Sequence, residues 1–564
     1  MTVDENAQSA LLTATATDPD GDALTFSIAG VDAADFAISS TTGVISAAAP
    51  LDFEEPADND GDNVYELTVS VSDGAASASS DISITVSDVP GDEPIKISGD
   101  FVGGRIGLSM RSAPDYDGDG VADLAIGADK AATATSDVVG YVLFSSEIAG
   151  LSGETFSLAD VITGVGVEFF VSSLASNTSF APTEVSAAAT SAGDAFAFFD
   201  HPLATTGARA TTQFFEGSAS DIAALGTRVD IGAAPASPLI RSTIDGSLED
   251  ADPAVFPELL AFALRPGLTP LAGESAIRPV GDVTGDGVFD FAFAAETTSG
   301  SQRFVYVVSG AAVAADADGA VSQSDLSFPD IFEIELEATD SSVLFGQSGD
   351  VDNDGFDELI FSSIGPPTAG ASLAYVIDGA GLVADADGAV SVSSLPGDLG
   401  FRINQDNAGP TPSFAFLDAN IVGDLTGDGR AEALVVVSAN RSTPTSDNAR
   451  SEGVLLSGSY LASLGATDVS LADDLAAGEG ADILPEPIDD VTGLATDAFG
   501  SGVARAFDLD NDNVLELAIG APFADTPQSV TSFEEAVGAI YVIPSTLATQ
   551  AIEDGGVIDL GDEF

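Results

Sequence analysis

Carboxylate and hydroxyl side chains recur at every second position in five short loops of this sequence. Each loop offers side-chain oxygen at its first, third, fifth and ninth residues, with Gly, or once Asn513, at the sixth. The loops span residues 115–123, 282–290, 350–358, 424–432 and 508–516. The alternation turns three oxygens toward one centre, and a left-handed sixth residue closes the loop. Such a wrap suits a hard cation, and irregular oxygen coordination favours Ca²⁺ over Mg²⁺.

The predicted ligands are the oxygen-bearing side chains at those four positions of each loop. They are Asp115, Asp117, Asp119 and Asp123; Asp282, Thr284, Asp286 and Asp290; Asp350, Asp352, Asp354 and Glu358; Asp424, Thr426, Asp428 and Glu432; Asp508, Asp510, Asp512 and Glu516. A site repeated in this way, without an adjoining base or nucleophile, favours structural ions over catalytic ones. We therefore expect about five calcium ions, bound at roughly 0.1–1 mM and coupled to folding.

The charge balance limits the partners of this chain. Acidic side chains number 91 against 15 basic ones, giving a formal net charge of −76 over 564 residues. Such a surface excludes nucleic acid and anionic lipid as partners. Hydrophobic residues make up 45% of the chain, which indicates packed cores rather than an acidic disordered segment. The excess charge keeps a protein soluble in saline water, so we expect a marine or halophilic bacterium as its source.

Several kinds of chemistry are missing from the composition. The chain has no cysteine and a single histidine, His201, so a zinc site or a Ser-His-Asp triad would depend on that residue alone. We expect no enzyme activity, with a carboxylate-pair glycosidase as the alternative. No apolar run is long enough to cross a bilayer, so no membrane insertion is expected. Met1 leads into a polar segment without a secretory signal, which implies another export route or a piece of a longer chain.

Residues 1–92 have the two-residue alternation of short strands separated by acidic turns. The predicted strands are 24–28, 43–47, 66–72 and 81–87. They favour a small antiparallel β-sandwich, which a Pro/Gly/acidic joint at 88–94 separates from the second domain, 93–564. The turn carrying Asp58, Asp60 and Asp62 is either a local calcium loop or a solvated turn.

This first segment resembles a cadherin repeat in its motifs VDEN, DPD, LDFE and VSVSDG. The resemblance implies calcium ligands at the C-terminal end of the sandwich, namely Glu5, Asp52, Glu54 and Asp88. It also implies that Asp18, Asp20 and Asp73 complete a calcium site shared with a preceding repeat. The joint DVPGDEP departs from the family pattern because it lacks both Asn residues of the usual linker.

From about residue 95 the sequence is periodic, and each acidic loop lies between two predicted strands. Two further strands follow in each repeat, and four strands per repeat are typical of a propeller blade. The first two loops lie about twice as far apart as the others, and 190–202 with 211–217 fill that gap with a repeat lacking its loop. We therefore predict an all-β chain with six blades, seven being the alternative. Residues 94–101 could close the ring by supplying the last fourth strand.

The repeats resemble the FG-GAP, or integrin-alpha-type, propeller. Residues 344–363 and 498–522 carry FG, the acidic loop and a following strand in order, and the second stretch ends in GAP. Members of this family commonly have seven blades. Together the two resemblances imply calcium-dependent adhesion outside the cell or at its surface.

Two functions remain open from the sequence. One is an extracellular module that binds a cell-surface protein or a glycan, with 161–194, 218–245 and 404–420 as candidate contact segments. The other is a structural subunit that assembles head-to-tail with further copies of itself into a fibre or surface layer.

Overall fold

In the computed structural model the chain forms two compact units, Met1–Asp92 and Glu93–Phe564. The first unit is described except for residues 5–9, 50, 52, 54–55 and 88–92. In the second unit, the described residues up to 145 are 94–99, 106–107, 109–113, 121–127 and 138–145. From 155 to 270 they are 155–158 and seven strands between 167 and 270. Beyond that they are 278–315, 326–337, 342–364, 373–385, 388–395, 399–404, 418–438, 451–464, 468–471, 475–485, 499–500, 502–508, 515–521 and 538–560.

The first unit is a sandwich of two sheets, as predicted. One sheet has the order β1 (Thr2–Asp4), β7 (Ser77–Ser87), β6 (Val64–Ser72) and β3 (Thr25–Ala29); the other has β2 (Leu12–Thr13), β5 (Val44–Ala47) and β4 (Phe36–Ile38). Alternate residues of β6 and β7 point inward, and Tyr65 and Ile84 are fully buried. The ring of Phe36 meets that of Tyr65 edge-on at 5.2 Å between centroids.

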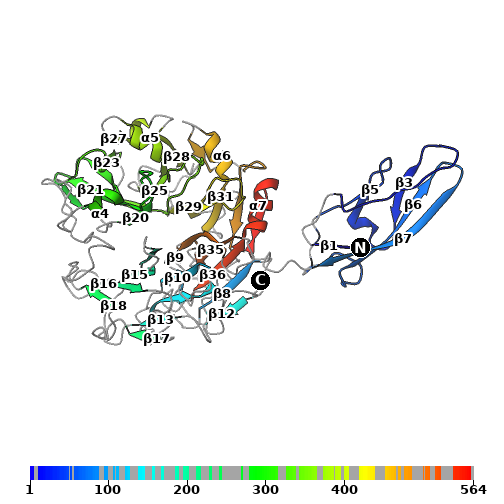
Figure 1. Ribbon diagram of the computed structural model, residues 1–564, viewed down its shortest axis with the longest axis horizontal. Coiled ribbons are helices and arrows are strands. Elements are labelled where there is room, and N and C mark those ends of the chain that lie inside the picture. The colour runs from blue at the N-terminus through cyan, green and yellow to red at the C-terminus, as the bar shows by residue number, and fades with distance from the viewer. Residues whose placement is uncertain are drawn as a thin grey trace, which may run out of the picture. The chain divides into compact units, whose positions relative to one another are not determined.

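The described residues of the second unit form six sheets, which Figure 1 shows arranged in a ring. From the innermost strand outward they are, in chain order: β9 (Ser109–Ala113), β10 (Asp123–Gly127), β11 (Val138–Leu143), β13 (Val167–Phe170); β14 (Glu184–Ala189), β15 (Ala195–His201), β16 (Thr211–Gly217), β18 (Ile240–Thr243); β20 (Arg278–Gly281), β21 (Asp290–Thr297), β22 (Arg303–Val308), β23 (Ile331–Glu335); β24 (Ser342–Phe345), β25 (Leu359–Ile364), β26 (Leu373–Ile377), β28 (Gly400–Asn404); β29 (Asp418–Gly423), β30 (Glu432–Ser438), β31 (Ser451–Leu456), β33 (Gly480–Leu484); β34 (Val503–Phe507), β35 (Glu516–Ala521), β36 (Ala539–Pro544), β8 (Ile95–Ser98). A further strand, β19 (Leu268–Pro270), pairs with β21. The strands expected after each acidic loop are confirmed, and the blade number stays a prediction.

The ring is closed by a strand from the beginning of the second unit. Strand β8 pairs antiparallel with β36, which confirms that residues 94–101 contribute the fourth strand of the last sheet. The loop-less repeat around 190–217 also forms a sheet, through β15 and β16. Its outer strand in the described residues is β18, which pairs antiparallel with β16.

Five sheets carry an additional outer strand that the sequence did not reveal. Each is parallel to its neighbour and comes from the segment after the third strand of the following sheet. They are β17 (Arg228–Asp230) on β13, β27 (Ala389–Ser391) on β23, β32 (Val469–Ser470) on β28, β37 (Val557–Asp559) on β33 and β12 (Thr155–Ser157) on β8.

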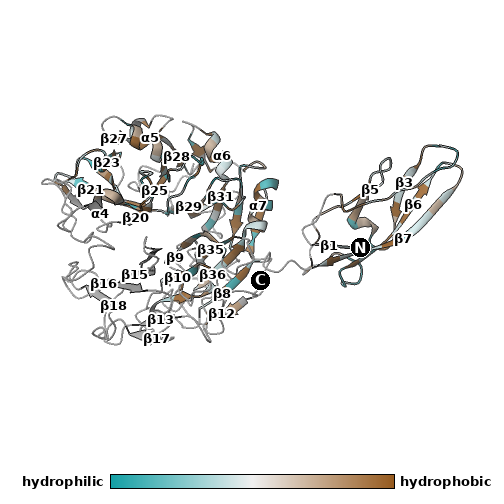
Figure 2. Cartoon of the chain, in the orientation of Figure 1, coloured by the Kyte–Doolittle hydropathy of each residue, from teal (hydrophilic) through white to brown (hydrophobic). Residues whose placement is uncertain are grey.

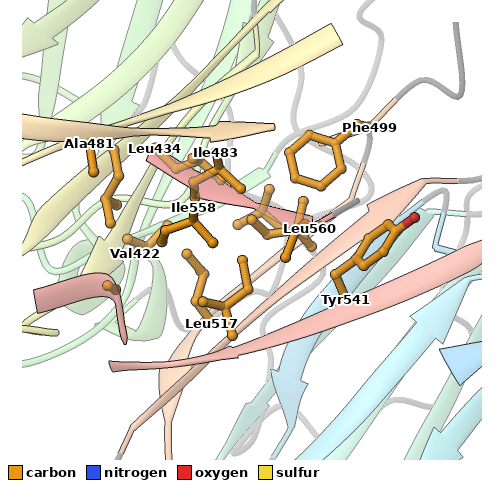
Figure 3. Close-up of a cluster of buried hydrophobic side chains, with 14 of the residues drawn as sticks. Val422, Leu434, Ala481, Ile483, Phe499, Leu517, Tyr541, Ile558 and Leu560 are labelled. Atoms are coloured by element: carbon orange, nitrogen blue, oxygen red, sulfur yellow. The ribbon is translucent and has the colours of Figure 1, made fainter. Parts of the chain in front are cut away.

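Short helices follow the third strands: α4 (Gly310–Ala315), α5 (Gly379–Ala384), α6 (Gly458–Ser463) and α7 (Ser545–Asp554). The hydrophobic cores lie between successive sheets, and Figure 2 shows the apolar colouring concentrated in the strands. In Figure 3, Leu434 and Ile483 of one sheet face Leu517 and Tyr541 of the next. Within the described residues, no helix combines the length and apolar character that crossing a membrane requires.

Polar side chains connect innermost strands of different sheets. The Arg111 Nη1 donates to the carbonyl oxygens of Met110 at 2.8 Å and Val503 at 3.4 Å. The Gln347 side chain donates to the same Val503 oxygen at 2.6 Å, and its main-chain N–H donates to Asn420 Oδ1 at 3.0 Å. Hydrogen bonds therefore link four of the six sheets where their innermost strands meet.

Candidate metal centres

Three of the five predicted loops are described in full, and each precedes the second strand of its sheet. Loop 282–290 joins β20 to β21, loop 350–358 leads into β25, and loop 424–432 joins β29 to β30. The β-pairing shifts register just before the first loop residue, between Pro279 and Gly281 and again between Ile421 and Gly423. This shift lets the chain leave the sheet as a closed loop at the hairpin end.

The first Asp of each loop organises the backbone around it. Asp282 accepts hydrogen bonds from the N–H groups of Asp286 at 2.9 Å and Gly287 at 2.8 Å. Asp350 and Asp424 accept the same two bonds from the fifth and sixth residues of their own loops. The three loops therefore share one geometry around this carboxylate.

Two residues of each loop adopt left-handed backbone conformations. The sixth residues confirm the prediction, with φ of +83° at Gly287, +94° at Gly355 and +87° at Gly429. The fourth residues do the same, with φ of +68° at Gly285, +64° at Asn353 and +72° at Gly427. Gly or Asn at the fourth position was the sequence signal for this second bend.

In loops 282–290 and 424–432 the buried ninth residue ties the loop to the helix that follows the third strand. Asp290 accepts from the N–H of Thr284 at 2.6 Å and from that of Gly310, the first residue of α4, at 2.9 Å. Glu432 accepts from Leu425 at 2.6 Å and from Gly458, the first residue of α6, at 3.2 Å. Burial raises the pKa of both carboxyls to about 7.

Loop 350–358 gives the clearest test of whether these residues fit a cation. Oxygens of Asp350, Asp352 and Glu358 lie within 4.8 Å of one another. Glu358 is only 5% exposed, and its Oε1 and the Asp352 Oδ1 are buried with no hydrogen-bond partner among the described residues. Burial, with the Asp352 charge adding to it, raises the pKa of Glu358 to about 9. A divalent cation supplies what these oxygens lack, so the residues fit.

The other two complete loops differ in how closely their carboxylates approach. Asp282, Asp286 and Asp290 also have oxygens within 4.8 Å of one another. In the part of the chain that the structure describes, the three carboxylates of loop 424–432 form no group that close. In both of these loops the predicted third-position ligand is a threonine hydroxyl that donates to the ninth carboxylate. Thr284 donates to Asp290 at 3.1 Å, and Thr426 donates to Glu432 at 3.2 Å.

The remaining two loops are described only in part. Asp123 is fully buried and accepts from the Ser145 N–H at 3.0 Å, the bond expected of a ninth residue. Asp508 and Glu516 lie at the two ends of the last loop, and Glu516 is buried. The predicted ligands Asp115, Asp117, Asp119, Asp510 and Asp512 lie outside the described residues.

In the sandwich, three of the seven predicted ligands are described. Asp18 accepts from the Asp20 N–H at 2.8 Å, and Asp73 accepts from the Ala75 and Ala76 N–H groups at 2.7 and 2.6 Å. The two bonds to Asp73 lower its pKa. These carboxylates stabilise their own turns, while Glu5, Asp52, Glu54 and Asp88 lie outside the described residues.

The turn at 58–62 gathers a third acidic group. Asp58, Asp60 and Asp62 have oxygens within 4.8 Å of one another, and the charge of Asp62 raises the pKa of Asp60. Asp32, which the sequence did not single out, is buried beside this turn. It accepts from the N–H groups of Asn59 at 2.8 Å and Glu66 at 2.6 Å, and so fixes the turn to β6.

Family comparison agrees with both resemblances. Residues 1–87 match the cadherin domain family and residues 499–543 match the FG-GAP repeat family. None of the curated proteins matches the sequence.

Three solved structures illustrate the structural comparison. Human protocadherin-24 EC1-2 is 24% identical over 18% of this chain, with a TM-score of 0.15, and this chain spans about half (51%) of its length. Drosophila N-cadherin EC1-3 is 30% identical over 16% of this chain and 30% of its own, with a TM-score of 0.14. The Dos1 propeller is 10% identical over 84% of this chain and 97% of its own, with a TM-score of 0.29. Scores this low add no argument of their own.

Proposed function

We propose that this chain is an extracellular, non-catalytic adhesion or binding protein whose propeller loops are stabilised by calcium. The family matches support the adhesion class, because a cadherin domain and an FG-GAP repeat occur together in one chain. The repeated loop geometry supports the stabilising role of the ion. Sea water or body fluid would saturate sites of roughly millimolar affinity, and cytosol would not.

One observation carries the calcium proposal, namely the buried Glu358 with an oxygen that no described group satisfies. An ionised carboxylate in such a place is costly unless a cation or a hydrogen bond compensates it. Bound calcium would neutralise the carboxylates of the loop and hold its hairpin end in one conformation. The side chains themselves position the ion, since their hydrogen bonds to loop N–H groups fix where the oxygens lie.

The test is thermal unfolding of the whole chain with calcium and with EDTA. A site that is saturated at 100 times its dissociation constant stabilises the folded chain by about 2.7 kcal/mol. Glu358→Gln should lower the free energy of unfolding by about that amount in calcium. In EDTA the same substitution should lower it by much less. Glu553→Gln, on the exposed face of α7, is the matched control and should change neither curve. Unfolding curves that calcium does not move would refute the proposal.

For the partner we propose a cell-surface protein or a glycan. The candidate contact segments 161–194, 218–245 and 404–420 fall largely outside the described residues, so the proposal rests on the family matches. A glycan array and a cell-binding assay, each with calcium and with chelator, would test it. Binding that persists unchanged in chelator would show that any partner is recognised without calcium.

Assembly with further copies of the chain is the second candidate. Asp18 and Asp73 are only partly buried and Asp20 is exposed, so all three can be reached by a second molecule. Electron microscopy in millimolar calcium would then show filaments that chelator disperses. Single particles under both conditions would exclude this candidate.

A further inference from the structure

The three complete acidic loops are hydrogen-bonded to one another across neighbouring sheets. The main-chain N–H of Asp357, at the eighth position of its loop, donates to the carbonyl oxygen of Asp282 at 3.0 Å. At the same position of the next loop, the Ala431 N–H donates to the carbonyl oxygen of Asp350 at 2.9 Å. The acceptor is in both cases the first residue of the preceding loop. The backbone that carries a predicted ligand is therefore held by the loop of the following sheet.

The contact between loops 282–290 and 350–358 has a second, side-chain component. The Asp357 carboxylate accepts from the N–H of Asp282 at 2.9 Å, so Asp282 is bound at both its N–H and its C=O. The ring of Phe356 lies against Gly285, where an added Cβ would be 2.3 Å from it. Ala431 has no such carboxylate, so this clamp is absent between loops 350–358 and 424–432.

We propose that Asp357 couples cation binding in loop 350–358 to cation binding in loop 282–290; this rests on the calcium proposal above. A cation in loop 350–358 fixes Asp350 and Glu358, and with them Asp357, which lies between these two residues in the loop. Asp357 then holds the Asp282 backbone in the conformation that points its carboxylate into its own loop. Ions at the two loops therefore bind with positive cooperativity. Asp357 acts as a positioning residue and is not itself a ligand.

The absence of tryptophan from the chain allows one loop to be observed alone. Phe289 is the eighth residue of loop 282–290 and is 50% exposed, so Phe289→Trp places a single indole beside that loop. Terbium replaces calcium at oxygen sites, and selective excitation of the indole sensitises only terbium bound nearby. Titration of the full-length variant with terbium then reports the affinity of this loop.

Substitutions at Asp352 and Asp357 in the Phe289→Trp chain then form a double-mutant cycle. Asp352→Ala removes a ligand from loop 350–358, and it should lower the terbium affinity of loop 282–290 by about fivefold or more. With Asp357→Ala already present, Asp352→Ala should no longer affect that affinity. Asp357→Asn should retain the coupling, because its amide oxygen can still accept from the Asp282 N–H.

The outcomes separate the coupling from the calcium proposal. If terbium binds loop 282–290 but Asp352→Ala leaves its affinity unchanged or raises it, the coupling is refuted and the calcium proposal stands. If the loss caused by Asp352→Ala is equal with and without Asp357, coupling exists but does not pass through this residue, which also refutes the inference. If no terbium luminescence develops at all, both proposals fail.

Discussion

The acidic side chains of this protein fall into two physical classes. Those at the first loop position accept hydrogen bonds from backbone N–H groups of their own loop, as Asp282 does. Asp290, Glu358 and Glu432 at the ninth position are buried, and burial is the main cause that raises the pKa of each, most strongly that of Glu358. The spacing of the sequence predicted both as ligands, but it contained no signal for the burial of the second class. Asp290 and Glu432 each accept a hydrogen bond from the first residue of the helix after the third strand, 20 and 26 residues later in the chain, and sequence spacing does not reveal that contact.

Asp418 offers a test of electrostatics that does not involve the loops. It lies partly buried on the innermost strand β29, where burial raises its pKa to about 6 and the charge of Arg111 opposes that rise. Because the folded-state pKa is above the ordinary value of 3.8, the protonated form is favoured on folding. The resulting stability is fully present below pH 3.8 and is lost as the pH rises through about 6.

The expected result is a pH-dependent difference between the wild type and Asp418→Asn in calcium. The free energy of unfolding of the wild type, relative to that of the variant, should fall by at most about 3 kcal/mol between pH 4 and 7. Urea titrations at several pH values measure this difference and cancel the contribution of the loops. A difference that stays constant with pH would mean that Asp418 has an ordinary pKa. The absolute stability of the variant is not diagnostic, since Arg111 loses its countercharge.

At the scale of elements, two glycines at the fourth loop position form a natural comparison. Gly285 and Gly427 have nearly the same φ, +68° and +72°. An added Cβ meets the Phe356 ring of the next loop at Gly285 and nothing within 4 Å at Gly427. Gly427→Ala should therefore cost about 1 kcal/mol from backbone strain alone. Gly285→Ala should cost a further ~1–3 kcal/mol because it separates the two loops.

Chemical denaturation in calcium measures both glycine variants. Equal losses at the two positions would show that Phe356 moves aside at little cost, and that loops 282–290 and 350–358 do not support each other through this contact.

Strands with a clear apolar pattern and a regular distance from an acidic loop could be predicted from the sequence, and strands without these features could not. Strands such as β22 and β25 follow an acidic loop at a regular interval and are apolar enough to be recognised alone. The outer parallel strands could not be found, because a strand as short as Val469–Ser470 has no periodicity. Its pairing depends on strand β28 of the preceding sheet, which sequence spacing does not reveal. The same holds for Asp357, whose importance lies entirely in its contact with another loop.

At the scale of the whole molecule, ring closure predicts where the chain can be shortened. Ile95 and Ile97 of β8 are buried in the core between the first and last sheets, and β8 pairs with both β36 and β12. Deletion of residues 1–92 should leave a folded propeller. Deletion of residues 1–99 removes β8 and should expose the edge of β36, giving a less stable and aggregation-prone chain.

Thermal unfolding and size-exclusion chromatography of the two truncated chains, in calcium, would compare them. Equal melting temperatures would mean that β8 contributes nothing to closure of the ring.

The net charge of −76 predicts a second, less specific dependence on ions. Like charges spread over the surface repel one another, and the screening length falls from about 10 Å at 0.1 M salt to about 3 Å at 1 M. Sodium chloride should therefore raise the melting temperature of the calcium-free chain gradually across this range. Calcium at a few millimolar should raise it further than sodium or magnesium chloride at equal ionic strength, because only calcium suits the irregular loops. If magnesium or sodium reproduces the whole effect of calcium, general screening explains the stabilisation and the acidic loops are not selective sites.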